Sequence, residues 1–92
     1  MRVGLVDDRY IDLDKLNGIV AAVPNVEIVF STQSAEEAYE YIKKEAVDLL
    51  IADIEMPNLS GYELADIIHS HALNIAVIFV TGSSGYAVHA FE

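Results

Sequence analysis

The chain has 92 residues, of which 53% are hydrophobic and 22% charged, so it is the size of one packed domain and disorder is excluded as its main state. No apolar run approaches the ~20 residues of a membrane span, the N-terminus lacks the pattern of a secretory signal and there is no cysteine, so we expect a cytoplasmic protein without membrane contact. Fifteen acidic against five basic residues give a net charge of −10, which argues against DNA binding by this chain itself.

Short apolar runs alternate with amphipathic segments along the whole chain. The apolar runs predict strands over residues 2–6, 26–30, 49–52 and 75–80. Helical spacing of apolar residues predicts helices over 11–23, from Ser34 to about Ala46, and from Gly61 to about His71, with a last helical start over 86–91. This alternation predicts parallel strands joined by right-handed crossovers, with helices on both faces: a doubly wound α/β sheet.

Three of the predicted strands end in residues that carry oxygen ligands or a hydroxyl. Asp7 and Asp8 follow the first strand, Asp53 follows the third and Thr81 follows the fourth. Taken singly, such an acidic residue is more often a turn former or a helix cap. Parallel strands, however, would bring all of them to one edge of the sheet, where three carboxylates repel one another unless a divalent cation neutralises them. We therefore predict a Mg²⁺ site, beside which a carboxylate can act as a nucleophile and form an aspartyl phosphate.

These residues resemble the receiver domain of bacterial two-component response regulators. The resemblance rests on Val6-Asp7-Asp8, on the stretch from Leu49 through Asp53 to Met56-Pro57 with Gly61 shortly after, and on Val80-Thr81-Gly82. It covers the whole chain and implies a flavodoxin-like receiver fold. It also implies a phosphoprotein of a phosphorelay, which takes a phosphoryl group from a sensor histidine kinase and controls an attached, transcriptional output.

The resemblance also implies a role for each matching residue. Asp53 would be the phosphoacceptor and one of the metal ligands, Asp8 a direct Mg²⁺ ligand, and Asp7 a residue that acts on the metal through water. Glu55 would offer its backbone carbonyl to the metal, and the hydroxyl of Thr81 would contact the phosphoryl group. Such a receiver is not an enzyme with a separate substrate, although it assists its own phosphorylation and dephosphorylation.

The chain departs from the family pattern at its C-terminal end. Receivers have a fifth strand and a fifth helix, with a lysine after that strand that contacts the phosphoryl group, whereas the last basic residue here is Lys44. We therefore expect residues 1–92 to be a receiver domain that lacks the fifth βα unit, and a fragment of a longer regulator. Residues 86–92 resemble regulators with a LytTR-type or SARP-type output, through which alone DNA would be bound. Residues 75–80 would become an exposed strand edge, which predicts self-association.

Two other functions are compatible with the same residues. The first is an interaction module with the receiver fold that is inactive in phosphotransfer, because the fifth βα unit is missing. The second is a Mg²⁺-dependent phosphatase or nuclease with Asp53-Ile54-Glu55 as an acidic metal motif. The second is disfavoured, because it requires a further general base or a substrate pocket that the sequence does not offer.

Overall fold

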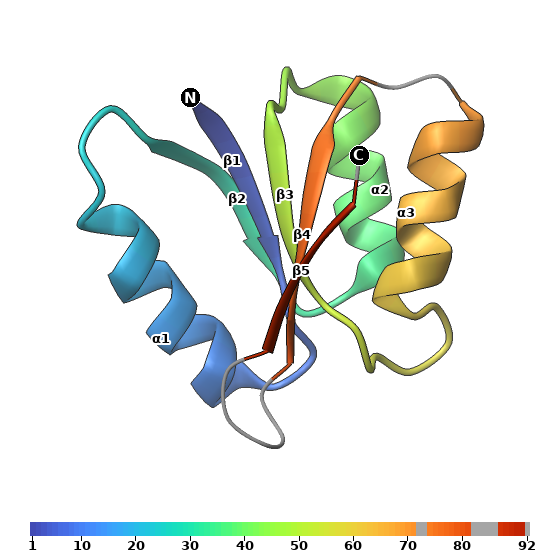
Figure 1. Ribbon diagram of the computed structural model, residues 1–92, viewed down its shortest axis with the longest axis horizontal. Coiled ribbons are helices and arrows are strands. Elements are labelled where there is room, and N and C mark those ends of the chain that lie inside the picture. The colour runs from blue at the N-terminus through green and yellow to red at the C-terminus, as the bar shows by residue number, and fades with distance from the viewer. Residues whose placement is uncertain (72–73, 82–86, 92) are drawn as a thin grey trace.

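The computed structural model describes residues 1–71, 74–81 and 87–91, with Thr81 and residues 87–91 described by their backbone. The elements follow one another as β1 (Arg2–Val6), α1 (Tyr10–Ala21), β2 (Glu27–Thr32), α2 (Ala35–Lys44), β3 (Leu49–Asp53), α3 (Gly61–Ser70), β4 (Ala76–Thr81) and β5 (Ala87–Phe91). They form one five-stranded sheet with the order β2-β1-β3-β4-β5. Helix α1 covers one face of the sheet, and α2 and α3 cover the other (Figure 1).

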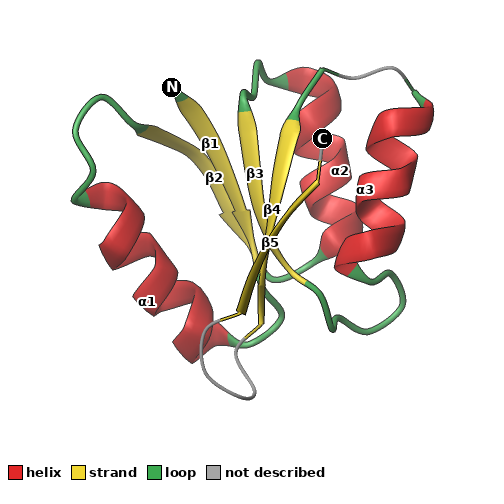
Figure 2. Ribbon diagram, in the orientation of Figure 1, coloured by secondary structure: helices red, strands yellow, loops and turns green. Residues whose placement is uncertain are grey.

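The first four strands confirm the predicted doubly wound arrangement. β1 pairs in parallel with both β2 and β3, and β3 pairs in parallel with β4. The winding reverses between β1 and β3, and this is where ligands bind in open α/β sheets. Val6 lies opposite Ala52, and Ala52 lies opposite Phe79, so the carboxyl ends of three strands lie side by side (Figure 2).

The predicted helical start over residues 86–91 is wrong. Residues 87–91 form β5, which pairs antiparallel with β4 from Thr81 opposite Ala87 to Val77 opposite Phe91. So short a segment is a poor isolated helix, and the free edge of β4 offers it backbone hydrogen bonds that a helix of this length does not. The expectation that residues 75–80 form an exposed edge is therefore also wrong, because β5 pairs with residues 77–81. The fifth strand does not come from a fifth βα unit.

The sheet is held by an apolar core on each face. The larger core, toward α2 and α3, includes the fully buried residues Leu50, Leu64, Ile68 and Phe79. Burying such a side chain stabilises the fold by about 1.5–3 kcal/mol, so this core holds β3, β4 and α3 in fixed positions. None of the helices within the described residues has the length and hydrophobicity of a membrane span.

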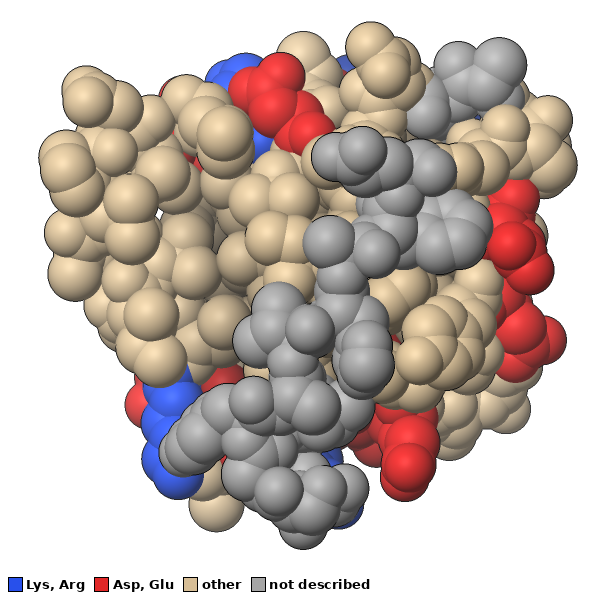
Figure 3. Space-filling view, in the orientation of Figure 1, with Lys and Arg blue, Asp and Glu red and all other residues tan. Residues whose placement is uncertain are grey.

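The smaller core lies between α1 and the sheet, and it is incompletely covered. Its buried members are Val3, Leu5, Leu13 and Val20. Beside it lies an apolar groove of about 520 Å³, which we call the α1 groove; it is lined by Met1, Val3, Val20, Val23, Pro24, Asn25, Val26, Leu49 and Ile51. The surface over this side of α1 is largely free of acidic and basic side chains (Figure 3).

The helix starts explain how the loops near the carboxyl edge are fixed. At the start of α2 the Ser34 hydroxyl accepts the Glu37 N–H. The Glu37 carboxylate accepts the Thr32 hydroxyl (2.7 Å) and not the Ser34 N–H, so only half of a capping box is formed. At the start of α3 both halves of a capping box are formed, since Ser60 and Glu63 each accept the other's backbone N–H at 3.1 Å. The start of α3, directly after the loop that leaves β3, is thus firmly fixed.

Candidate functional site

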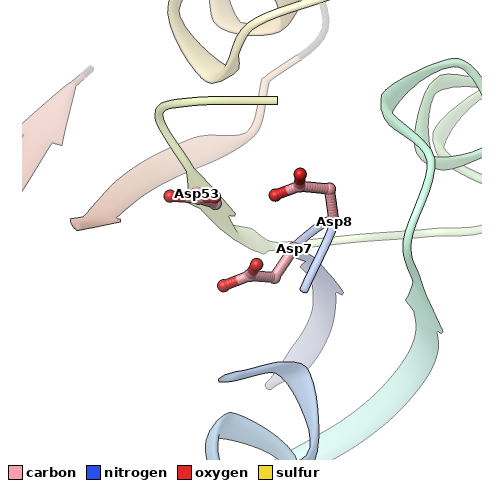
Figure 4. Close-up of side chains that lie close together, drawn as sticks. All are labelled: Asp7, Asp8 and Asp53. Carbon is pink, nitrogen blue, oxygen red and sulfur yellow. The ribbon is translucent and has the colours of Figure 1, made fainter. Parts of the chain in front are cut away.

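Three carboxyl groups meet at the carboxyl edge of the sheet, as the sequence predicts. Asp7 and Asp8 directly follow β1, and Asp53 is the last residue of β3. One carboxylate oxygen from each lies within 4.8 Å of the others. Figure 4 shows the three side chains gathered where the two strands end. The parallel pairing of β1 with β3 is the cause, because it places both strand ends at the same level of the sheet.

The cluster is largely removed from solvent. Asp7 is 6% exposed and Asp53 is 9% exposed. Burial raises the pKa of Asp53 to about 7, and the charges of Asp7 and Asp8 act in the same direction. Burial also raises the pKa of Asp7, although its Oδ1 accepts the Arg9 N–H at 2.9 Å. Asp7 and Asp53 therefore carry their negative charges at a cost in stability.

The donor set fits a hard divalent cation. Oδ1 of Asp8 is buried and has no hydrogen-bond partner. The ion pairs found within the described residues do not include Asp7, Asp8 or Asp53, and the guanidinium of Arg9 pairs with Asp12 at 3.7 Å. Carboxylate oxygens at this separation are the ligands that Mg²⁺ takes from proteins, and the cation would satisfy the unpartnered oxygen.

The turn after β2 holds the acidic pair in place. The Asp7 N–H donates to the Thr32 carbonyl at 3.1 Å, and Nε2 of Gln33 donates to the Asp8 carbonyl at 3.1 Å. Sequence reasoning missed Gln33, because its partner lies 25 residues away and no local pattern marks it. The backbone of Asp7 is thus bonded to the last residue of β2, and the backbone of Asp8 to the side chain of the residue that follows β2.

The two remaining predicted site residues lie at the same edge. Glu55 is exposed and lies two residues beyond Asp53; its side chain is not a member of the carboxylate cluster, and the prediction concerns its backbone carbonyl. Thr81 is the last residue of β4, one position beyond Val80, which lies opposite Asp53. The Thr81 side chain lies outside the described residues, so its predicted contact with a phosphoryl group stays a prediction.

Comparison with known proteins decides the family. The response regulator receiver domain matches residues 3–92. The chain belongs to this family. The receiver is 63% identical over 92 residues to the transcriptional regulatory protein NatR of Bacillus subtilis, a match that covers 100% of this chain and 40% of NatR. It therefore spans well under half the length of that relative.

Solved structures agree with the receiver fold. The response regulator domain of Thermotoga maritima CheB is 32% identical, with a TM-score of 0.80 over 95% of this chain and 66% of that one. The response regulatory domain of MrkE from Klebsiella pneumoniae is 26% identical, with a TM-score of 0.81 over 92% of this chain and 70% of that one. The receiver resemblance of the sequence is thus confirmed.

Proposed function

We propose that this receiver accepts a phosphoryl group from a sensor histidine kinase on Asp53. In this proposal Asp7, Asp8 and Asp53 hold Mg²⁺ together with the backbone carbonyl of Glu55. The observation that carries it is the convergence of three buried or half-buried carboxylates within 4.8 Å, with an unpartnered oxygen on Asp8. Family membership supplies the reaction class, since receiver domains receive phosphoryl groups from sensor kinases.

The residues of the receiver account for the chemistry of transfer. A carboxylate oxygen of Asp53 attacks the phosphorus of a phosphohistidine, the P–N bond breaks, its electron pair stays on the imidazole, and an aspartyl phosphate forms. Bound Mg²⁺ would neutralise charge on the phosphoryl oxygens and on the carboxylates. Asp53 must be deprotonated to attack, and a cation beside it favours that form over the protonated form that burial stabilises. The Thr81 hydroxyl would donate to a phosphoryl oxygen.

We further propose that the receiver is a signalling domain and not an enzyme with a separate substrate. It assists its own phosphorylation and dephosphorylation in the cytoplasm, and the phosphorylated state controls a transcriptional output. Support comes from NatR, a transcriptional regulatory protein of which this chain spans 40%. With a net charge of −10, the receiver itself repels DNA, so DNA contact belongs to another part of the protein.

Mapping the phosphorylated residue tests the proposal. The full-length protein is incubated with a small-molecule phosphodonor and Mg²⁺, and the trapped acyl phosphate is located by mass spectrometry. We expect modification at Asp53 alone, with loss in D53N and on removal of Mg²⁺ by a chelator. D66N is the matched control, because Asp66 is an exposed carboxylate on α3. Modification of D53N at the wild-type level would contradict the assignment.

The inactive interaction module is a second candidate, favoured by one observation. Residues 87–91 pair antiparallel with β4, so this fifth strand is not the parallel strand after which the receiver family carries a cationic lysine. Such a group stabilises the charge that develops during transfer. The same experiment separates the two candidates, because the module would bind Mg²⁺ without forming an acyl phosphate.

We also propose that this chain associates with itself through the α1 groove. The support is the apolar lining of the groove, at whose rim Met1 is 64% and Val23 47% exposed. Apolar surface of this kind is typical of contact sites. Light scattering after size exclusion should show a mass that rises with concentration, and V23K should lower it. Y62K, which changes an equally exposed residue on the opposite face, should not.

A further inference from the structure

Gly61, the first residue of α3, lies directly against the backbone of the candidate phosphoacceptor. Its N–H donates to the Ile54 carbonyl at 2.9 Å, and the residue is buried. A Cβ atom at this position would lie 3.1 Å from both the Asp53 carbonyl carbon and Ile54 Cα, and closer still to the Asp53 carbonyl oxygen. The first turn of α3 therefore approaches the end of β3 to a distance that only a residue without a side chain allows.

The requirement for glycine here is one of space and not of backbone conformation. The left-handed residue of this loop is Asn58 (φ 70°), whereas Gly61 starts a regular helix. The atoms that would clash are backbone atoms, which have no rotamer to move into. Gly18 on α1 differs, because a Cβ at that position would have no heavy atom within 4 Å apart from its neighbours in sequence and the backbone of its own helix.

A side chain at position 61 would have to move either α3 or the Asp53–Ile54 peptide. Helix α3 is held by the Ser60–Glu63 capping box and by Leu64 and Ile68, which are both fully buried. The peptide is therefore the part expected to turn. Its carbonyl carbon is bonded to the Cα that carries the Asp53 carboxylate, so turning it redirects the nucleophile.

We propose that Gly61 is a positioning residue for Asp53: by letting α3 press on the Asp53 carbonyl, it fixes the direction of the Asp53 carboxylate toward Asp7 and Asp8. The proposal rests on the proposed function of Asp53 as phosphoacceptor and metal ligand. Gly61 touches no reacting atom, and its effect is carried by the Asp53–Ile54 peptide.

The experiment compares three variants of the full-length protein. G61A adds the methyl group that meets the Asp53 carbonyl. S60A removes the capping hydroxyl and weakens the start of α3 without placing an atom on Asp53, and G18A makes the same glycine-to-alanine change in open space. For each, the maximal rate of Asp53 phosphorylation and the donor concentration at half-maximal rate are measured at saturating Mg²⁺.

We expect G61A to lower the maximal rate by about tenfold or more while the donor concentration at half-maximal rate stays within about twofold, since the nucleophile is misdirected and the donor is not. S60A and G18A should stay within about twofold of the wild type. A wild-type rate for G61A, or an equal loss in S60A, would overturn the proposal. If G61A is partly unfolded, trimethylamine N-oxide is added until all proteins show the same far-UV circular dichroism.

A second measurement separates failure of this inference from failure of the proposed function. If the wild type forms no acyl phosphate at Asp53, the phosphotransfer proposal is wrong, and Mg²⁺ affinity decides the role of Gly61. G61A should then bind Mg²⁺ about fivefold more weakly than S60A, because one ligand is misdirected. Equal affinities would contradict positioning, and absence of Mg²⁺ binding in the wild type would contradict both proposals.

Discussion

The two ends of β1 differ in how their acidic neighbours are neutralised. At the amino end, the Arg2 guanidinium is surrounded by acceptors. At the carboxyl end, the carboxylates of Asp7, Asp8 and Asp53 lie together, and no basic side chain of the described residues forms an ion pair with them. Arg2 pairs with Glu27 at 3.3 Å and Glu45 at 3.0 Å, and its Nε donates to the Ala46 carbonyl at 2.6 Å. The Arg2 backbone N–H donates to Asp48 at 2.7 Å. One strand thus joins a cluster of paired acids to a cluster of unpaired ones.

Exposure makes the difference between the two clusters larger. The Glu27 and Glu45 side chains are 67% and 45% exposed, whereas Asp7 and Asp53 are 6% and 9% exposed. Water solvates an exposed carboxylate whether or not it is paired, but a buried, unpaired one lowers the stability of the fold. A protein keeps such a cost where a ligand relieves it. The paired acids at the amino end therefore stabilise the fold, whereas the cost of the acids at the carboxyl end supports the proposal that a cation binds there.

The same substitution at the two ends should change stability with opposite signs. D53N removes one charge from the buried cluster, and we expect the free energy of unfolding without Mg²⁺ at neutral pH to rise. Raising the pKa of Asp53 from 3.8 to about 7 corresponds to a cost of about 4 kcal/mol for its ionised form in the folded state. Screening by water at the sheet edge lowers the expected gain to about 1–2 kcal/mol. D48N, which weakens the acceptor of the Arg2 backbone N–H at the amino end, should lower stability instead. Urea unfolding measures both, and a loss of stability in D53N would contradict the comparison.

Mg²⁺ should stabilise the carboxyl end and leave the amino end unchanged. A cation that binds only the folded state adds about 1.4 kcal/mol at a concentration ten times its dissociation constant. Urea midpoints of the wild type should therefore rise with Mg²⁺, and D8A and D53N should lose most of this rise. The control is R2A, which should keep it. An equal rise in D8A would place the cation elsewhere.

The stability of the cation-free receiver should fall as the pH rises through neutrality. The pKa of Asp53 is raised in the folded state to about 7 from an ordinary value of 3.8. The folded state therefore binds a proton more tightly than the unfolded state, and this contribution is full at acidic pH and is lost as pH passes the folded pKa. Relative to D53N, we expect a loss of about 1 kcal/mol from about pH 6 to about pH 8. Parallel pH profiles of the two proteins would show that Asp53 ionises normally.

Local patterns in the sequence predict most of the sheet and the position of the site. The apolar runs and the helical spacing between them predict β1 to β4 and their crossovers, although β2 lies at the sheet edge and leaves Glu27 and Ser31 exposed. The acids at the strand ends converge because parallel strands end at the same edge of the sheet. The Ser60–Glu63 capping box also has a local signal, a serine three residues before a glutamate.

The features that the sequence does not predict depend on partners far along the chain. Residues 87–91 contain valine and phenylalanine, which fit a strand or an apolar helix face, and the edge of β4 decides between them. The contact of Gln33 with the Asp8 carbonyl and the pairing of Arg2 with Glu45 join residues 25 and 43 positions apart. No local pattern encodes such contacts.

The smallest expected effect is that of removing Arg2, and it tests whether the two ends of β1 are independent. The Arg2 side chain is 36% exposed, so R2A should lower the free energy of unfolding by only about 0.5–1 kcal/mol, and the loss should be smaller at about 500 mM than at about 20 mM salt. Five residues of β1 span about 16 Å, which exceeds the screening length of about 8 Å at physiological salt. The Mg²⁺ affinity of R2A, measured by NMR titration of the amides near Asp7 and Asp53, should therefore equal that of the wild type. R2K, which keeps the charge, should show an intermediate stability. A change in Mg²⁺ affinity beyond about twofold in R2A at physiological salt would show that β1 couples its two ends through its backbone, since the charge itself is screened.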